Sequence, residues 1–433
     1  MVVSQENSLP SWFLSWAIQI LSLVSFVVLI PLIKDNYAAA TYDLWIFINT
    51  IIVFGIVFET SLIGPVTRIL SYLYRGNEIF DAEGTKLISS CTFNQAASSL
   101  LFFYFAIAGL ASLTVVILAK VFGSHFEPSQ LLMAKMFSLV AFFQVLASIS
   151  KGMMIARMKI AQQRLLQLII YSIRLGVAAL VVSMSLPFML VIGIFVLSAI
   201  CELFLYTRYS SFKFETPPTS DILFIVMENF RKTLPLKLSV TLTNFSTSLI
   251  IGLTSLTNLS VYILTFRVFY MIGSIANVPL TLSLPSIYRE VIRSSTQYPL
   301  NWLNYYAVTI ALYCVGSAVF VTAIFYFPKD LGPDLSVYFL DDFKSVLLML
   351  LFCLLECNRV VFVQLCEASN RVQYTAFYVL AALVSITAQI CYARLSTEPS
   401  LFDFLLIQFI IASVMVFWLH PMRFFDITRQ GQK

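Results

Sequence analysis

The sequence predicts an all-α polytopic membrane protein with about 12 transmembrane helices in two six-helix lobes. Three observations lead to this fold class: 59% of the 433 residues are hydrophobic, only 11% are charged, and the mean hydropathy is +0.88. Soluble domains carry roughly 25% charged residues, and the polar residues present here are too few to cover a surface that faces water. Most of the apolar side chains must therefore face lipid.

Apolar stretches that are long enough to cross a bilayer, about 20 residues in a helix, occur 12 times. The first begins without the pattern of a cleavable signal, so we expect it to stay in the membrane. Three residues separate the fifth from the sixth, which predicts a tight helical hairpin. The predicted spans are residues 10–33, 44–66, 95–121, 130–150, 164–183, 187–207, 234–254, 260–286, 303–327, 343–366, 374–393 and 401–420.

The positions of lysine and arginine predict the orientation. With a cytoplasmic N-terminus, inside segments hold eighteen of the 27 basic residues, outside segments hold five, and four lie within spans. Because basic residues concentrate on cytoplasmic loops, both termini are expected in the cytoplasm. This topology accounts for the net charge of +5, so no nucleic-acid partner is expected.

The spans divide into two sets of six. Residues 1–209 are expected to form the N-terminal lobe and residues 233–433 the C-terminal lobe. Between them, residues 210–232 form a predicted cytoplasmic linker with a short interfacial helix at 221–231. The remaining loops are short, so the sequence offers no external domain that would hold a catalytic site.

A weak internal repeat relates the two halves at an offset of 220 residues. Tyr42-x-Leu44 matches Tyr262-x-Leu264, and a proline near the cytoplasmic end of the second span has its counterpart in the eighth. Halves with the same topology predict parallel repeats about an axis along the membrane normal, with a substrate path between the lobes. Chance similarity between hydrophobic segments is the alternative.

Charged residues inside spans are candidate functional residues, because each costs about 2.5–3.5 kcal/mol to insert. Lys135 lies near the outer end of its span and can extend its ammonium to the surface. A pair three residues apart in the tenth span can neutralise itself, and Arg174 can either bind substrate or pair with Glu202 on the next span. The charged set is Glu59, Lys135, Arg174, Glu202, Arg267, Glu356 and Arg359.

Polar side chains also recur at helical spacing on three spans. Steps of three and four residues place them on one face of each helix, and such a face must contact protein or water. Together with the arginine they favour a water-filled cationic cavity over interhelical hydrogen bonds, which contribute about 0.6 kcal/mol each. The stripes are Ser15, Gln19 and Ser22; Lys237, Thr241, Asn244 and Ser248; and Arg267, Tyr270, Ser274, Asn277 and Thr281.

A cationic cavity points to an anionic substrate that carries phosphate, because a guanidinium binds phosphate through paired hydrogen bonds. Arg267 is the leading phosphate-binding candidate. Glu59 is a candidate for proton or sodium coupling, or a counter-ion to Arg267. The other predicted substrate-binding residues are Arg174, Arg359, Lys237, Gln19, Asn49, Asn244, Tyr270 and Asn277.

Motifs of enzyme chemistry are missing from the sequence. It contains no G-x-x-x-x-G-K-[ST], no H-E-x-x-H and no acidic D-x-D on an external loop. Its seven cysteines include no C-x-x-C, and its two histidines lie far apart. We therefore expect no catalytic residue, no metal site and no cofactor, and the protein is not expected to be an enzyme.

Three stretches resemble the polysaccharide-unit flippases of the Wzx type, in the multidrug/oligosaccharidyl-lipid/polysaccharide exporter (MOP) superfamily. Residues 30–33 (IPLI) and 42–47 (YDLWIF) look like the family's first-to-second helix junction. Residues 233–239 (TLPLKLS) and 261–268 (VYILTFRV) look like the starts of its seventh and eighth helices. The six-plus-six layout extends this resemblance over the whole chain.

Two positions depart from the family pattern. Asp43 stands where a glycine usually follows the tyrosine, and Ser246-Thr247-Ser248 replaces an Asp-Arg pair late in the seventh helix. The resemblance implies two lobes around a cavity built from the first, second, seventh and eighth helices. It also implies alternating access, in which an undecaprenyl-diphosphate-linked oligosaccharide turns from the inner to the outer leaflet.

The sequence is thus interpreted as a flippase for a lipid-linked glycan unit of O-antigen or a related surface polysaccharide. Expected partners are the lipid-linked oligosaccharide, membrane lipids, H⁺ or Na⁺, and a glycan polymerase. A drug or metabolite exporter of the same superfamily is the nearest alternative. A membrane glycan polymerase or glycosyltransferase would need an external loop with paired arginines or acids, and an assembly protein would hold costly arginines without purpose.

Overall fold

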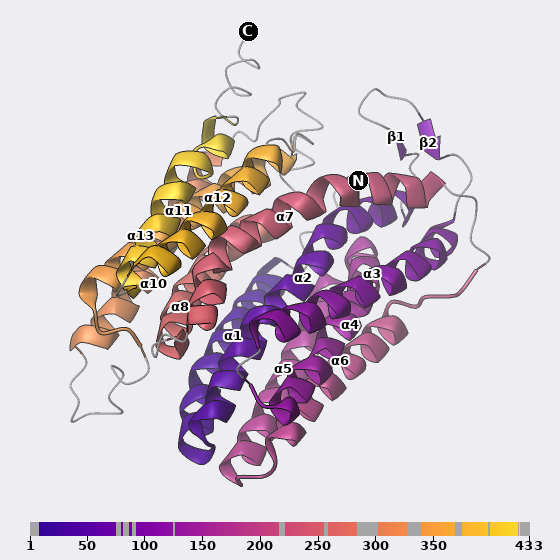
Figure 1. The fold of residues 1–433 in the computed structure, drawn as a ribbon. Helices are drawn as coiled ribbons and strands as arrows, with labels where there is room; N and C mark the ends of the chain where they lie inside the picture. Colours follow the sequence, from indigo (N-terminus) through magenta and orange to yellow (C-terminus); the bar gives the residue numbers. More distant parts are fainter. Residues whose placement is uncertain are drawn as a thin grey trace. The chain divides into compact units, whose positions relative to one another are not determined.

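The computed structural model describes most of the chain. The described residues are 8–74, 79–80, 86–88, 92–123, 126–215, 221–254, 259–283, 302–326, 339–368, 375–396, 399–422 and 424. Within these ranges the fold is almost entirely α-helical (Figure 1).

Long helices follow one another along the chain (Figure 1). In the first half they are α1 (Ser8–Asn36), α2 (Ala39–Tyr74), α3 (Phe93–Phe122), α4 (Pro128–Ala156), α5 (Ile160–Ser183) and α6 (Phe188–Tyr209). They continue with α7 (Asp221–Thr254), α8 (Leu259–Ala276), α10 (Trp302–Tyr326), α11 (Phe343–Ala368), α12 (Thr375–Leu395) and α13 (Leu401–Met415). Two short strands, β1 (Ile79–Phe80) and β2 (Lys86–Ile88), pair antiparallel between α2 and α3.

Eleven of the described helical segments are long and apolar enough to cross a membrane. They correspond to all of the predicted spans except the seventh, which lies in the more polar α7. The predicted fold class, an all-α polytopic membrane protein with about 12 spanning helices, is confirmed. Several helices are longer than predicted: α2 begins five residues before residue 44 and α4 continues to Ala156.

Helix α7 differs from its predicted form. The sequence favoured a short interfacial helix at 221–231 followed by a separate span, but the structure has one helix of 34 residues with Pro235 inside it. Proline removes one backbone donor without ending the helix here, since the apolar residues on both sides remain buried. Ile222, Val226 and Phe230 pack into the core of the first half.

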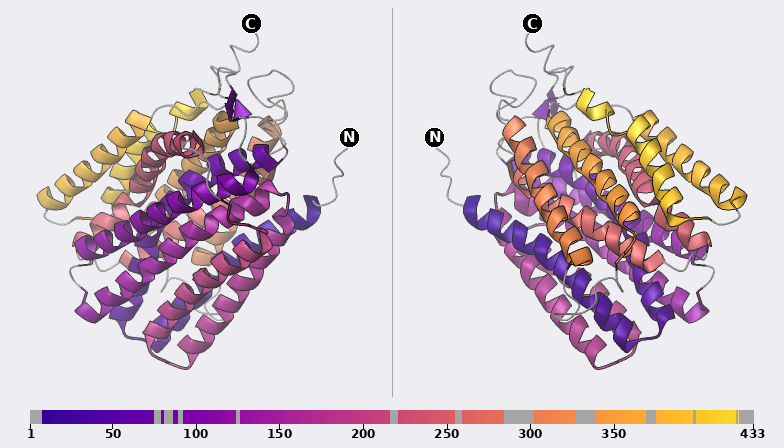
Figure 2. Two further views of the ribbon diagram at one scale, coloured as in Figure 1. Left: turned by 90° about the vertical axis from the view of Figure 1, so that its right-hand side faces the viewer. Right: turned by 90° about the vertical axis from the view of Figure 1, so that its left-hand side faces the viewer.

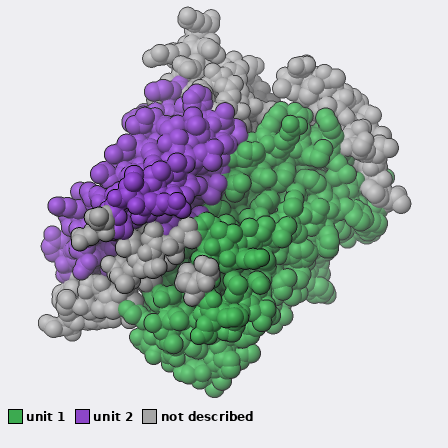
Figure 3. All heavy atoms as spheres, viewed as in Figure 1, with its two compact units in different colours: residues 1–238 green, residues 239–433 purple. Residues whose placement is uncertain are grey.

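The chain forms two compact units, residues 1–238 and 239–433, which Figure 3 distinguishes by colour. In the first unit, α4 packs against α2, α3 and α6, and α1 packs against α5; Figure 2 gives two further views of these helices. Helix α2 approaches α4 closely at Gly55, where a Cβ atom would lie 2.7 Å from the Cβ of Ala141. Small residues at such crossings let membrane helices pack closely.

The hairpin between α5 and α6 is as tight as predicted. Helix α5 ends at Ser183 and α6 begins at Phe188, and Ser185 takes a left-handed conformation with φ of 50°. The hydroxyl of Tyr37 donates to the carbonyl oxygen of Leu186 at 2.5 Å. This contact fixes the hairpin to the end of α1.

In the second unit, α11 packs against α8, α10 and α13, and α12 packs against α13. Buried aromatic rings fill its core, including those of Tyr262, Phe266, Phe269, Tyr313 and Phe417. The interior of this unit is therefore tightly packed around α11, the helix that carries its buried ion pair.

Candidate functional site

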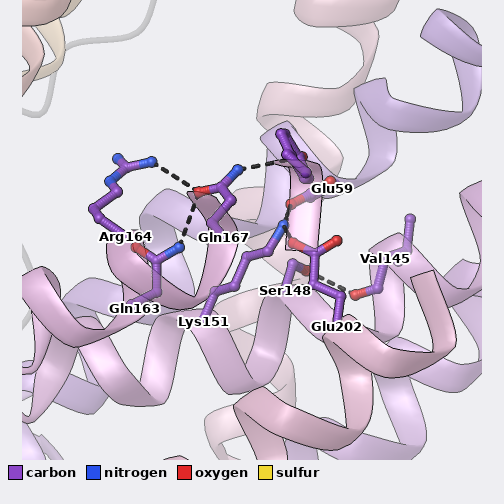
Figure 4. Close-up of polar contacts among 9 residues, drawn as sticks. Glu59, Val145, Ser148, Lys151, Gln163, Arg164, Gln167 and Glu202 are labelled. Carbon is purple, nitrogen blue, oxygen red and sulfur yellow. Dashed lines mark hydrogen bonds and ion pairs between the residues drawn. The ribbon is translucent and has the colours of Figure 1, made fainter. Parts of the chain in front are cut away.

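Lys151 lies at the centre of a buried cluster of charges in the first unit. Its ammonium is 3.1 Å from Oε1 of Glu59 and 3.1 Å from Oε1 of Glu202. The three residues come from α4, α2 and α6, and Figure 4 shows both carboxylates pointing toward the lysine nitrogen. Only 10%, 13% and 2% of the side chains of Lys151, Glu59 and Glu202 are exposed. We call these three residues the triad.

The triad carries a net charge of −1 when all three groups are ionised. Burying charges costs several kcal/mol per ion, which a close partner offsets only in part. Lys151 also lies 5.7 Å from the centre of the Tyr206 ring. A buried charge in a membrane-spanning helix is a candidate functional group by default, and one that can change its net charge by binding a proton is a candidate for coupling.

The sequence interpretation of Lys151 was wrong. The fourth span was ended at residue 150, which placed Lys151 on an inside loop, but α4 continues to Ala156 and encloses the lysine. Glu59 has Lys151 as its partner, whereas the sequence offered Arg267 as its counter-ion. Two carboxylates in spans without a nearby cation were the signal that a buried lysine was missing.

A ladder of polar side chains on α5 lies next to the triad (Figure 4). Gln163 Nε2 donates to Gln167 Oε1 at 3.2 Å, and Gln167 Nε2 donates to the hydroxyl of Tyr171 at 3.2 Å. Arg164 donates to the same Gln167 oxygen at 3.2 Å. Steps of four residues put the two glutamines and the tyrosine on one face of the helix. The sequence analysis missed these glutamines.

Arg174 does not pair with Glu202, so this predicted alternative is wrong. Its guanidinium carbon lies 4.2 Å from the centre of the Tyr171 ring and 4.8 Å from that of Phe195. Among the described residues no carboxylate forms an ion pair with it. Stacking on aromatic faces stabilises the cation and leaves its N–H edge able to donate.

The buried ion pair of the second unit lies on a single helix. Nε and Nη2 of Arg359 donate to the two oxygens of Glu356 at 2.7 and 2.6 Å. Asn244 adds a hydrogen bond to Glu356 Oε1 at 3.0 Å. The three-residue spacing predicted this neutral pair, in which Nε and Nη2 of Arg359 are engaged by Glu356.

Polar residues of α7 beside the predicted stripe of the seventh span make hydrogen bonds within the second unit, together with the stripe residue Asn244. Thr247 donates to Gln408 Oε1 at 2.5 Å, and Gln389 donates to Thr247 at 2.8 Å. Gln408 also donates to the carbonyl oxygens of Thr243 and Asn244 at 2.7 and 2.9 Å. At Asn244 the interhelical hydrogen bonds that the sequence analysis held as the alternative are present.

The stripe of the eighth span is divided between core and surface. Arg267 is half-buried, and Tyr270 is 38% exposed. Asn277 is buried and donates to the carbonyl oxygen of Gly273 at 2.9 Å and to Sγ of Cys357 at 3.5 Å. Arg267, the charged residue of this stripe, thus lies between core and surface, whereas Asn277 helps to hold α8 against α11.

Three predicted site residues lie elsewhere in the first unit. Gln19 is half-buried on α1. Asn49 is buried and donates to the carbonyl oxygen of Trp45 one turn earlier at 2.8 Å. Lys237 donates to the carbonyl oxygen of Thr60 at 2.5 Å, which ties α7 to α2. The structure does not bring these three together with Arg174 into one cluster.

Comparison with known proteins gives no match to a family model and none to a curated protein sequence. Solved structures do match over nearly the whole chain. A MOP-superfamily transporter from Pyrococcus furiosus, described as having a binding pocket of reversed polarity, shares 13% identity with a TM-score of 0.60, covering 97% of this chain and 95% of its own.

Two structures of MATE transporters agree with this match. The inward-facing conformation of a MATE family transporter of the MOP superfamily has 13% identity and a TM-score of 0.60, covering 99% of this chain and 97% of its own. A eukaryotic MATE transporter has 13% identity and a TM-score of 0.56, covering 98% and 95%. At this identity the likeness concerns the fold: the chain has the two-lobed helical fold of MOP-superfamily transporters.

Proposed function

We propose that the protein is a membrane transporter that turns an undecaprenyl-diphosphate-linked oligosaccharide from the inner to the outer leaflet of a bacterial inner membrane. The fold supports transport, because solved structures with this fold include transporters in inward-facing and outward-facing conformations. The finer assignment to O-antigen or another surface glycan, with both termini in the cytoplasm, rests on the sequence resemblance and the distribution of basic residues.

The proposed substrate class rests on the surroundings of Arg174, which stacks on two aromatic rings and has no carboxylate partner among the described residues. A half-buried arginine in an apolar helix is expensive unless it has a partner. The aromatic rings of Tyr171 and Phe195 lie against the guanidinium of Arg174 and orient it without using its hydrogen-bond donors. A diphosphate provides the acceptors and the negative charge that such a group binds best.

Arg267 is the second proposed phosphate ligand. It is half-buried in α8, a helix otherwise rich in apolar and aromatic residues. Gln19, Tyr270 and Lys237 are proposed to contact the glycan or its headgroup. Asn244 and Asn277 donate to Glu356 and Cys357 of α11, so their part is to hold the helices of the second unit in place. Arg359 and Asn49 are engaged in hydrogen bonds within their own helices.

Glu59 is proposed as a coupling residue, acting through the triad. A net charge of −1 in a buried site changes to zero when one proton binds, and the two forms differ in how strongly the helices are held together. A proton gradient is the proposed driving force, with Na⁺ as the alternative cation. A glycan polymerase is the proposed downstream partner.

Export of a drug or metabolite is a second candidate function. It is favoured by the fold match to multidrug transporters and by the buried carboxylates Glu59 and Glu202, which suit a cationic substrate better than an anionic one. The two functions differ in whether the arginines are needed, because a cationic drug gains nothing from Arg174 or Arg267.

The test uses the purified full chain in vesicles that contain a fluorescent undecaprenyl-diphosphate oligosaccharide, with transfer between leaflets as the readout. Arg174→Ala and Arg267→Ala should each lower the transfer rate about ten- to a hundredfold, since a hydrogen bond to a charged group contributes about 1.5–3 kcal/mol. The lysine variants should be intermediate. Arg208→Ala, at an exposed arginine of α6, is the control.

Normal transfer by both alanine variants would reject phosphate recognition by these arginines. A cationic dye that is transported by the wild type and by both variants would instead support the exporter. Protein levels and thermal stability measured on the same samples separate loss of binding from loss of folding.

A further inference from the structure

Two buried polar atoms beside the triad make no hydrogen bond among the described residues: the hydroxyl of Tyr206 and Oε1 of Gln163. Their residues are 0% and 2% exposed. Oε1 of Glu202, on a residue that is 1% exposed, makes an ion-pair contact with the Lys151 ammonium at 3.1 Å. A buried polar atom without a hydrogen bond costs about 1–3 kcal/mol, so the hydroxyl and the amide oxygen point to a small polar guest.

These atoms come from two neighbouring helices. Tyr206 lies one turn from Glu202 on α6, and its side chain interacts with Gln163 on α5 as well as with Glu202 and Lys151. Helices α5 and α6 pack side by side. The polar atoms therefore form a connection between the face of α5 that carries the glutamines and the carboxylate of Glu202.

The glutamine ladder extends this connection toward the membrane surface. Helix α5 begins at Ile160, directly after the turn that contains Arg157 and Lys159. Gln163 lies within the first turn and Gln167 within the second, each four-residue step rising about 6 Å. Polar side chains thus lead from the end of α5, which the basic residues predict to be cytoplasmic, to the level of the triad.

We propose that Gln163, Gln167 and Tyr206 line a proton access path from the start of α5 to Glu202. The proposal rests on the coupling role assigned to the triad under the proposed function. It adds a route and names the carboxylate that receives the proton. Glu202 is the receiving group because it lies one turn from Tyr206 on α6, whereas Oε1 of Glu59 accepts a hydrogen bond from Lys151.

The proton balance of the path is simple. A hydronium ion at the start of α5 passes its proton along water molecules bound by the two glutamine amides. The Tyr206 hydroxyl accepts one proton and releases its own, and Glu202 becomes a neutral carboxylic acid. The triad then carries no net charge, with Lys151 paired to Glu59, and release of the proton in the reverse order restores the charge of −1.

The charged and titratable groups that face the path come from all the helices around it. Lys151 repels the incoming proton and the two carboxylates attract it, so the triad, with its net charge of −1, attracts the proton. Arg164 and Arg174 on α5 repel it, so the hydroxyls and amides between them carry the transfer. The complete set is Glu59, Tyr104, Lys151, Arg164, Tyr171, Arg174, Glu202 and Tyr206.

Infrared difference spectroscopy after a rapid pH jump tests the path on the purified full chain in lipid nanodiscs. The wild type should gain a carboxylic-acid band on acidification, and Glu202→Gln should lose that band. Gln163→Leu and Gln167→Leu should give the same final band about tenfold more slowly, the factor expected for about 1.4 kcal/mol of added barrier. Gln162→Leu, at an exposed glutamine on the same helix, should keep the wild-type rate.

Two further variants keep the test sharp if a leucine disturbs folding. Gln167→Asn retains the amide on a shorter side chain and should give an intermediate rate, and Tyr206→Phe should slow protonation without changing the final band. Wild-type rates in both glutamine→leucine variants would overturn the path. If the Glu202→Gln variant keeps the carboxylic-acid band of the wild type, Glu202 is not the receiving group.

Failure of the proposed function has a different signature. If the band and the slowed rates appear as expected, the access path stands. If transfer of the fluorescent lipid-linked oligosaccharide in vesicles is then insensitive to an imposed pH gradient, the coupling part of the proposed function is rejected while the path is retained.

Discussion

The two units handle their buried charges in opposite ways. In the first unit, Lys151 joins carboxylates from two other helices, and its partner Glu59 is 92 positions away in sequence. In the second unit, Arg359 pairs with Glu356 three positions before it on the same helix. The first cluster has a surplus negative charge, whereas the second is neutral.

This difference indicates which of the two charge clusters is expected to have a function in coupling. A neutral pair on one helix can form as soon as that helix forms, and it moves as part of the helix. A charge cluster that spans α2, α4 and α6 depends on the packing of all three helices. A proton that binds there alters contacts between three helices, whereas the two partners of the pair on α11 lie on one helix.

Removing Lys151 should have the largest effect on stability. Lys151→Met leaves two buried carboxylates facing each other without a cation, so we expect a loss of about 5 kcal/mol, at the upper end for breaking a buried ion pair. Thermal unfolding of the purified protein in detergent measures it. Lys135→Met on the exposed side of α4 is the matched control.

Adding Glu59→Gln and Glu202→Gln to Lys151→Met should recover most of this loss, because no buried charge is then left uncompensated. Equal stability of Lys151→Met and Lys135→Met would show that the triad contributes nothing to holding the three helices together.

Breaking the local pair should cost less. Arg359→Leu leaves Glu356 with the hydrogen bond from Asn244 and with no second carboxylate beside it, so we expect a loss of about 3 kcal/mol. The exchanged variant with Glu356→Arg and Arg359→Glu should regain part of it, since both partners stay on one helix. The same unfolding measurement tests this, and a stable Arg359→Leu protein would contradict the comparison.

The smallest expected effect concerns neutral hydrogen bonds of the second unit. Gln408→Leu removes two bonds to α7 carbonyl oxygens and one from Thr247, so at about 0.6 kcal/mol per bond in a membrane protein the loss should be about 2 kcal/mol. The exposed Gln162→Leu serves as the reference. A loss as large as that of Lys151→Met would mean that polar packing, not charge, dominates both units.

Much of the fold could be predicted from apolar run length. Span positions agree with the structure because an apolar run of about 20 residues has few options other than a membrane helix. Ends were less predictable, as with Lys151, where a single charge was interpreted as the start of a loop. The structure instead continues the helix to Ala156, because two carboxylates on other helices compensate the ammonium.

The candidate site could be predicted only in part from the sequence. Glu59, Arg174 and Arg267 stood out as charges in apolar runs, and the pair on α11 followed from its spacing. Gln163 and Gln167 did not, because glutamines near the start of a span are common. Their significance depends on the atoms of Tyr206 and Glu202 that lie beside them.

The sequence by itself determined that this chain forms a set of long membrane helices. Each apolar run is continuous in sequence and long enough to cross the bilayer, so its hydrophobicity alone favours a position in lipid. Only the tertiary structure decided which charge meets which partner. Electrostatic and hydrogen-bond energies depend on separations of a few ångströms, and those separations between α2, α4, α5 and α6 are set by helix packing rather than by spacing along the chain.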